Sequence, residues 1–305
     1  MHYNYGWADG YHMDLEYWEI WNEPESKAMW LGTWEEFCEF YSVVANYLKK
    51  CFPNLKIGGY SATGFYSVFR EKMDAGWFKI AVPYCKQFLE YVTAETTKAP
   101  LDFFSWHCYA LNPKELENFA YYARETLDSY GLTKTESFLT EYNMFECFTR
   151  RPSVTETHAS EIVAGIVLGQ NAPVDSIMYY DVRTSIYNGI FALKEDCINV
   201  KRYQLFYGFK WFNELYKLKG QCFAKSENEK VYVLSATDEK QKKVLVSVTD
   251  FDGDLSFNFD ECKGNKIVVR CSTFRKSTPT RKIYDFTKNF VLTVKKNNLY
   301  LIEIK

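Results

Sequence analysis

Between residues 15 and 183, short apolar segments alternate with longer segments in which apolar residues recur at helical spacing. Phe37, Phe40, Tyr41, Val44 and Leu48 are one such set, because residues three and four positions apart share a helix face. The short apolar runs between these segments predict strands. Five strands are expected, at Leu15–Trp21, Leu55–Tyr60, Asp102–Tyr109, Glu136–Glu141 and Ser176–Asp181.

Capping residues stand where the helical pattern begins and ends. Thr33 with Glu36 forms a capping-box sequence, Asn112 followed by Pro113 is typical of a helix start, and Gly131 is typical of a helix end. Further helices are expected at Phe78–Thr93, His158–Gln170 and Arg202–Leu218. Alternating strands and helices predict a parallel sheet, as in a (β/α)8 TIM barrel, although only five strands are found.

The pattern changes at Lys219, after which no helical period remains. Apolar and polar residues alternate singly, and turn residues such as Asp252-Gly253 separate the runs. This alternation predicts a C-terminal antiparallel β-sandwich. We therefore expect two domains, residues 1–218 as the barrel part and residues 219–305 as the sandwich. The expected sandwich strands are Val231–Ala236, Lys243–Thr249, Leu255–Phe259, Lys266–Cys271, Phe290–Lys295 and Asn298–Ile304.

Charge and composition exclude several classes of protein. The 37 Lys and Arg residues against 39 Asp and Glu give a net charge of −2, which argues against a nucleic-acid partner. No apolar run is long enough to span a membrane, and the first residues do not have the pattern of a signal peptide. Only four histidines are present, without zinc-ligand spacing, so neither a metal nor another cofactor is expected.

The nine cysteines include no C-x-x-C pair. Cys38, Cys85 and Cys108 lie in predicted helices or strands, so we expect them to be buried, free thiols. Free thiols favour a reducing, cytoplasmic or anaerobic setting, but the location of the protein stays open.

Two carboxylates follow predicted parallel strands, Glu23 in the sequence Trp-Asn-Glu-Pro and Glu141 in Thr-Glu-Tyr-Asn. The carboxyl ends of barrel strands form the active-site face of such folds. Paired carboxylates suit glycoside hydrolysis, in which one donates a proton and the other attacks or activates water. Asn22 is placed to bind a sugar hydroxyl. A single glutamate at a strand end is more often a solvated surface group, so the hypothesis rests on the pair.

Three motifs resemble the strands of a known enzyme group: YWEIWNEPE at Tyr17–Glu25, DFFSWHCYA at Asp102–Ala110 and FLTEYN at Phe138–Asn143. They are similar to strands four, six and seven of retaining glycoside hydrolases, and most similar to family 39, the β-xylosidase and α-L-iduronidase group. The resemblance implies a carbohydrate substrate.

By this resemblance Glu23 is the general acid/base and Glu141 the nucleophile, and Asn22 contacts the sugar 2-hydroxyl. The resemblance also places His107 and Tyr109 near the nucleophile and the bound sugar. A further tyrosine, Tyr180, would form a wall of the pocket.

Other readings of these side chains remain open. The histidine can instead be a core residue with satisfied hydrogen bonds, and the two tyrosines can be packing residues. Glu19 alternates with Trp21 and is interpreted as a buried structural carboxylate. Trp30 and Trp34 can form a sugar platform, although Trp34 is expected to pack on the first turn of its helix.

The resemblance begins at barrel strand four, and only 14 residues precede Leu15. Three strand–helix units do not fit there, since each needs about 30 residues. We therefore expect a barrel that lacks strands one to three. Either the chain is a truncated gene product, or another polypeptide, a second copy or a complementing N-terminal fragment, supplies the missing strands. The expected function is a retaining, exo-acting glycosidase on xylosides or related plant-type sugars. A non-catalytic sugar-binding remnant and an inverting enzyme remain alternatives.

Overall fold

The computed structural model describes residues 14–71, 76–145, 155–182, 190–193, 199–259, 262–274, 276 and 278–305. These residues fall into two compact units, and each is described separately. One unit comprises Met1–His107, Tyr122–Thr140 and Val174–Ser176, and the other comprises Cys108–Tyr121, Glu141–Pro173 and Ile177–Lys305. No described helix is long and apolar enough to cross a membrane.

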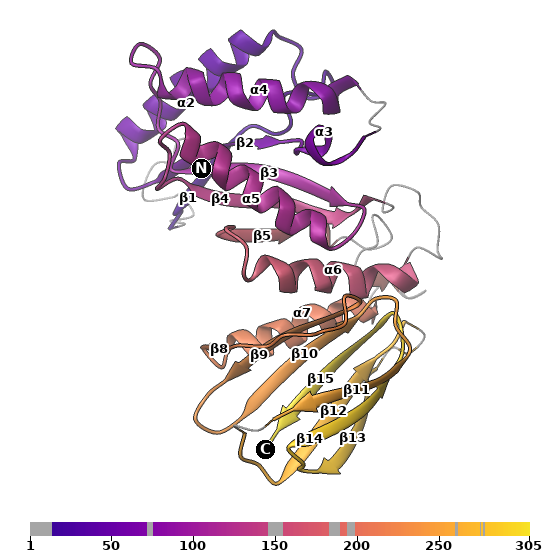
Figure 1. Cartoon of the computed structure of the whole chain (residues 1–305). Coiled ribbons are helices and arrows are strands. Elements are labelled where there is room, and N and C mark those ends of the chain that lie inside the picture. The colour runs from indigo at the N-terminus through magenta and orange to yellow at the C-terminus, as the bar shows by residue number, and fades with distance from the viewer. Residues whose placement is uncertain are drawn as a thin grey trace. The chain divides into compact units, whose positions relative to one another are not determined.

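A five-stranded sheet follows the chain order β1-β2-β3-β4-β5, and the pairs β1–β2 and β2–β3 are parallel. All five predicted strands are present, and the connections are mostly helical, as expected (Figure 1). The strands are β1 (Tyr17–Ile20), β2 (Lys56–Ala62), β3 (Phe103–Ala110), β4 (Glu136–Met144) and β5 (Ser176–Tyr179). The helices between them are α2 (Trp34–Cys51), α3 (Tyr66–Phe69), α4 (Gly76–Thr93), α5 (Lys114–Ser129) and α6 (Thr155–Gly169).

Helices α2 and α4 cover one face of the strands β1 to β3 (Figure 1). The predicted capping box starts α2: the Glu36 amide donates to the Thr33 hydroxyl oxygen, and the Thr33 amide donates to the Glu36 carboxylate. Of the apolar positions predicted for α2, Phe37 and Tyr41 are buried, and Phe37 packs edge-on against Tyr60 of β2. The core of this unit is therefore aromatic.

Glycine allows β2 and β3 to approach closely. A β-carbon at Gly58 would lie 2.1 Å from the carbonyl oxygen of Phe103, closer than any side chain permits. The Gly-Gly pair in the sequence of β2 is thus explained by strand packing.

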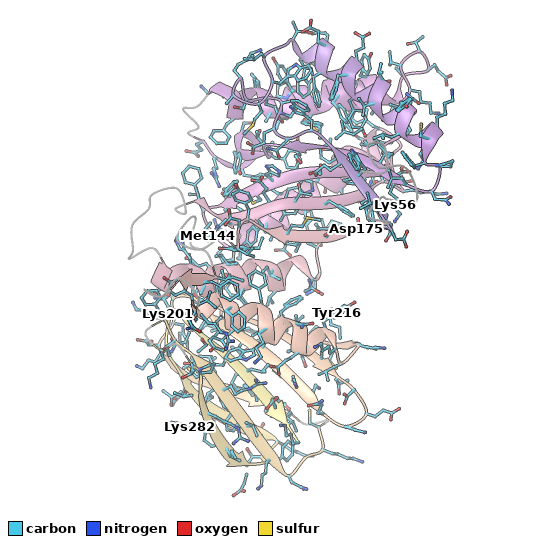
Figure 2. All side chains as sticks on the ribbon, turned by 180° about the vertical axis from the view of Figure 1, so that it is seen from behind. Lys56, Met144, Asp175, Lys201, Tyr216 and Lys282 are labelled. Carbon is cyan, nitrogen blue, oxygen red and sulfur yellow. The ribbon has the colours of Figure 1, made fainter. Side chains whose placement is uncertain are left out.

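Charged pairs hold the amino ends of the strands. Lys56 at the start of β2 bonds Glu136 at the start of β4 at 2.9 and 3.2 Å. Asp102 accepts from the Ile57 amide and from Lys49, each at 2.8 Å. Asp175 accepts from the Ser137 amide at 2.7 Å, and Figure 2 shows Lys56 and Asp175 near one another. These contacts fix the register of the sheet at the end opposite to Glu23.

The C-terminal strands form two antiparallel sheets, of order β13-β12-β15-β10-β9-β8 and β11-β14, which enclose a common apolar core. This arrangement confirms the antiparallel strands predicted from the alternation. The six predicted strands match β9 (Val231–Thr237), β10 (Lys242–Val248), β11 (Gly253–Asn258), β12 (Lys266–Ser272), β14 (Asn289–Val294) and β15 (Asn298–Ile304). Two strands were not predicted, β8 (Gly220–Cys222) and β13 (Thr280–Asp285).

Helices α6 and α7 (Gln204–Tyr216) pack on each other and on β9 and β10 (Figure 1). The Ser247 hydroxyl of β10 donates to the Ser160 carbonyl of α6. Arg270 of β12 binds the Glu214 carboxylate of α7 with both terminal nitrogens, and Glu303 of β15 at 2.9 Å. A short hairpin, β6 (Phe191–Leu193) with β7 (Val200–Arg202), precedes α7 and was not predicted.

The predicted burial of the free cysteines is confirmed for Cys38, Cys85 and Cys108. The Asn112 side chain accepts from the Lys114 amide, as expected for a cap of α5. The predicted domain boundary at residue 219 stays a prediction.

Candidate active site

Glu23 lies in the loop that follows β1, and its backbone is held in an unusual conformation. Its φ angle is 46°, in the left-handed region that residues other than glycine rarely adopt. The Glu23 amide donates to the Ser61 carbonyl at the end of β2, over 3.1 Å. The chain therefore turns sharply after the strand and presents the Glu23 carboxylate at its carboxyl end, with 18 % of the side chain exposed.

His107 of β3 is the partner of the Glu23 side chain. Its Nδ1 lies 2.8 Å from Glu23 Oε1, and the histidine side chain is only 1 % exposed. The sequence left open whether this histidine is a core residue or part of the site. It is buried, and it also contacts the predicted acid/base, so it can orient that carboxyl and exchange a proton with it.

Glu141 of β4 has a different partner on β3. The Tyr109 hydroxyl donates to Glu141 Oε2 over 2.6 Å, a length typical of a hydroxyl bound to an ionised carboxylate. Tyr109 is 8 % exposed, so the bond is largely shielded from water. The bond fixes the direction in which this carboxylate oxygen points.

Tyr180 follows β5 directly, and its ring meets the Tyr109 ring edge-on, with the ring centroids 6.5 Å apart. Its amide donates to the Tyr142 carbonyl, and its own carbonyl accepts from the Asn143 side chain at 2.7 Å. Tyr180 thus lies beside the Tyr109 ring. Its predicted role in the wall of the pocket stays a prediction. Asn22 precedes Glu23 and is partly exposed; its predicted contact with a sugar hydroxyl stays a prediction.

The structure corrects the interpretation of Glu19 and confirms that of Trp34. Glu19 was interpreted as a buried structural carboxylate, but its side chain is exposed on β1, so that interpretation is wrong. The strand ends at Ile20 and Trp21 has a φ of 72°, so the alternation that linked Glu19 to Trp21 does not continue. Trp34 is 5 % exposed and stacks on Tyr84, which confirms its packing role.

Sequence reasoning gave no role to Glu25. This side chain is 3 % exposed, and its Oε1 accepts from the Thr63 amide over 3.2 Å. Burial, assisted by the negative charge of Glu23, raises the pKa of the Glu25 carboxyl to about 8. No signal marked it, because a glutamate after Asn-Glu-Pro and before Ser-Lys reads as a solvated loop residue.

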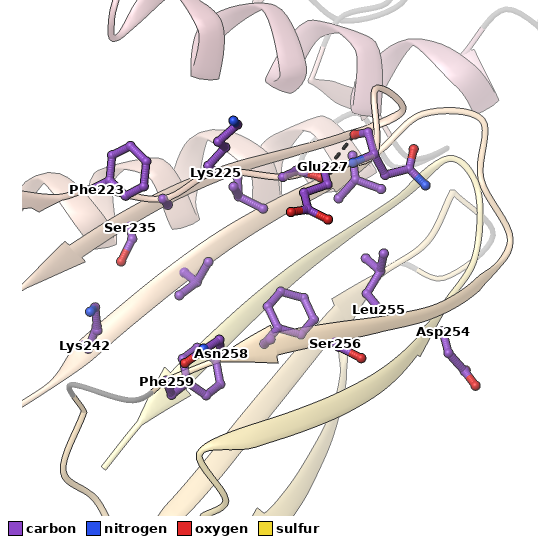
Figure 3. Close-up of a pocket in the computed structure, with 17 residues that line it drawn as sticks. Phe223, Lys225, Glu227, Ser235, Lys242, Asp254, Leu255, Ser256, Asn258 and Phe259 are labelled. Atoms are coloured by element: carbon purple, nitrogen blue, oxygen red, sulfur yellow. Dashed lines mark hydrogen bonds between the residues drawn. The ribbon is translucent and has the colours of Figure 1, made fainter.

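A separate groove of about 600 Å³ lies in the β-sandwich (Figure 3). The chain after β8, the strands β9 and β10, and β11 line it, and its floor includes Val231, Val244 and Phe259 of the apolar core. None of the predicted site residues lies in this groove. The carboxylates at the strand ends, rather than this groove, are therefore the candidate catalytic groups.

Comparison with known proteins agrees with this geometry. Residues 9–157 match the family model described as Glycosyl hydrolases family 39. No curated protein sequence matches the chain. The solved structure of a glucosidase from Croceicoccus marinus superposes with a TM-score of 0.75 and 19 % identity, covering 98 % of this chain and 71 % of that one.

Two further solved structures share the fold. A GH39 β-xylosidase from Caulobacter crescentus has a TM-score of 0.68 and 18 % identity, covering 95 % of this chain and 66 % of its own. The GH39 enzyme from Xanthomonas axonopodis pv. citri has a TM-score of 0.66 and 15 % identity, covering 95 % of this chain and 68 % of its own. The resemblance drawn from the three motifs is confirmed, and with it the general class of O-glycosyl hydrolase.

Proposed function

Because residues 9–157 match the family model of glycosyl hydrolases family 39, we propose that this chain cleaves glycosides by a retaining double displacement. Glu23 is the general acid/base and Glu141 the nucleophile. The substrates are xylosides or related plant-type sugars, from which an exo-acting enzyme removes the terminal residue. The structural similarity to a β-xylosidase and to a glucosidase supports this choice of substrate class.

One observation carries the proposal: each of the two carboxylates has its own partner on the same strand. His107 binds Glu23 and Tyr109 binds Glu141, and these two partners are two residues apart on β3. Side chains two apart on a strand face the same way. The two carboxylates therefore have different surroundings, which supports the different roles of acid/base and nucleophile.

In the proposed first step, the Glu141 carboxylate attacks the anomeric carbon while the Glu23 carboxyl gives its proton to the leaving oxygen. In the second step, Glu23 takes a proton from water, which then displaces Glu141 from the glycosyl ester and regenerates both groups. Asn22 binds the 2-hydroxyl, and the rings of Tyr109 and Tyr180 shape the sugar pocket.

The test is hydrolysis of a panel of 4-nitrophenyl glycosides, led by the β-D-xyloside, by the wild-type chain and by Glu23→Ala and Glu141→Gln. We expect turnover that both substitutions abolish, and a first-formed sugar with the anomeric configuration of the substrate by proton NMR. An inverted product would instead support an inverting enzyme, whose carboxyl groups lie about 6.5–9.5 Å apart rather than about 5–5.5 Å. A folded sample with no turnover would support the sugar-binding remnant.

We also propose that additional polypeptide completes the sheet, from a second copy or from a complementing segment. Among the described residues, β1 pairs only with β2 and β5 only with β4. Trp18 on β1 and Met178 on β5 are 46 % and 45 % exposed, as expected of strands that lack a neighbour. Light scattering of the purified chain distinguishes a dimer from a monomer.

A further inference from the structure

The loop that carries Glu23 is attached to β2 at two points. One is the bond from the Glu23 amide to the Ser61 carbonyl, and the other is the bond from the Thr63 amide to the Glu25 carboxyl. Only the second uses a side chain of the loop. Since Pro24 alone separates the two glutamates, the Glu25 carboxyl fixes the chain direction immediately after Glu23.

The same contacts continue to β3. The Ser61 amide donates to the Ser105 hydroxyl oxygen over 2.8 Å, and Ser105 is two residues before His107. His107 in turn contacts the Glu23 carboxyl. Hydrogen bonds therefore connect the loop to the end of β2, the end of β2 to the middle of β3, and β3 back to the loop. Within the loop, Glu25 supplies the buried carboxyl.

We propose that Glu25 is a positioning residue, whose buried carboxyl holds the Asn22–Ser26 loop on the end of β2 and thereby aims Glu23 at His107 and at the leaving oxygen. This inference rests on the proposed function of Glu23. It adds a residue to which neither the motifs nor the comparisons give a role.

The environment of Glu25 suits a neutral carboxyl. Its Oε2 is buried, and so is the hydroxyl oxygen of Tyr60 on β2. Burial raises the pKa of Glu25 to about 8, so the group is mostly protonated at pH 7. A neutral carboxyl accepts a hydrogen bond from the Thr63 amide through one oxygen and adds no charge beside Glu23. A permanently ionised carboxylate at this position would add a negative charge there.

The backbone of Glu23 explains why an anchor is needed. A φ of 46° is unfavourable for a residue other than glycine, and it persists only where surrounding contacts impose it. Without the Glu25 carboxyl, the loop loses its bond from the Thr63 amide. The Glu23 carboxyl then samples positions in which it cannot protonate the leaving group.

The test compares Glu25→Ala and Glu25→Gln in the full chain, with Asp102→Ala as the matched control. Asp102 also accepts from a main-chain amide of β2, but at the opposite end of that strand. The readout is kcat/KM for a phenyl glycoside and for the 2,4-dinitrophenyl glycoside of the same sugar. The 2,4-dinitrophenolate leaves without protonation, so only the phenyl substrate depends on a correctly placed acid.

We expect Glu25→Ala to lose about 100-fold on the phenyl substrate and about threefold on the activated one. Glu25→Gln should recover most of the loss, because its amide oxygen still accepts from the Thr63 amide. Asp102→Ala should lower both rates equally or leave them unchanged. Equal losses on both substrates in Glu25→Ala, or a loss in Glu25→Gln as large as in Glu25→Ala, would overturn the proposal.

A second readout does not depend on turnover, and so separates this inference from the proposed function. In chains labelled with 15N-histidine, the Nδ1 resonance of His107 reports its contact with Glu23, and Glu23→Ala gives the position of the resonance without that contact. We expect Glu25→Ala to move the resonance toward that position and Glu25→Gln to leave it in place. An unmoved resonance in a folded Glu25→Ala chain refutes the positioning role, even if the wild-type chain proves inactive.

Discussion

Replacing Tyr109 by phenylalanine removes a single hydroxyl, the one that donates to Glu141 over 2.6 Å. The ring remains, and with it the edge contact to Tyr180. In the second step of the proposed mechanism, Glu141 leaves the anomeric carbon and regains its negative charge. A hydroxyl already aimed at this oxygen stabilises that charge as it develops.

The size of the effect follows from the type of bond. A hydrogen bond to a charged group contributes about 1.5–3 kcal/mol, and each 1.4 kcal/mol is a factor of about 10 in rate. Loss of the hydroxyl should therefore slow release of the glycosyl group by about 10- to 150-fold. Attack by Glu141 should suffer less, because its charge is already present before attack and declines during it.

The assay is stopped-flow hydrolysis of the 2,4-dinitrophenyl glycoside, for which release of the sugar limits the rate. We expect kcat of Tyr109→Phe to fall by the stated factor, kcat/KM to fall less, and the steady-state rate that follows the burst of 2,4-dinitrophenolate to be slower than in the wild type. Tyr216→Phe is the control, since Tyr216 is 77 % exposed at the end of α7 (Figure 2). An unchanged kcat, or a kcat/KM that falls as far as kcat, would contradict the assigned role.

Three further predictions concern stability, each measured by urea unfolding. Arg270→Met should cost about 3 kcal/mol at pH 7, because it leaves Glu214 partly buried with fewer partners. Arg270 and Lys243 hold the pKa of Glu214 below its ordinary value. The stability that this ion pair contributes is therefore present above the ordinary pKa of a glutamate, and it should shrink as the pH falls through the lowered pKa. A cost of Arg270→Met that does not change with pH would be inconsistent with this origin. Burial lowers the pKa of His158 to about 4, so the wild type should lose of order 2 kcal/mol between pH 6.5 and 4, and His158→Gln should show a shallower slope; equal slopes would exclude the histidine as the cause. Gly58→Ala should cost at least about 2 kcal/mol through its clash with the Phe103 carbonyl, and a stable variant would show that β2 and β3 can separate.

The sequence predicted those elements whose own pattern decides their structure. Helix α2 has both a capping box and a clear apolar face, and the alternation in β11 and β14 fits a strand with one buried side. Strand β13 was missed because Thr280–Asp285 is mostly polar and exposed; it is a strand only because it pairs with β12. Neighbours that are distant in sequence decide such elements, and a local pattern does not contain them.

The candidate site divides in the same way. Glu23 and Glu141 could be found because each stands at the end of a strand in a recognisable motif. Their partners His107 and Tyr109 were expected near the site, but the assignment of one to each carboxylate needed the structure. The burial of Glu25 depends on how the loop folds onto β2, and the exposure of Glu19 depends on where β1 ends. Neither follows from residue type or spacing.

The ion pairs at the amino ends of the sheet and the candidate catalytic groups at its carboxyl ends are separated by the full length of β2, about 20 Å for its seven residues. This distance exceeds the screening length of about 8 Å at physiological ionic strength. The charges of Lys56 and Asp102 should thus have little electrostatic effect on the candidate catalytic groups. Substitutions at the two ends should combine additively, so one end can be strengthened to tolerate heat while the other is altered to accept a different sugar.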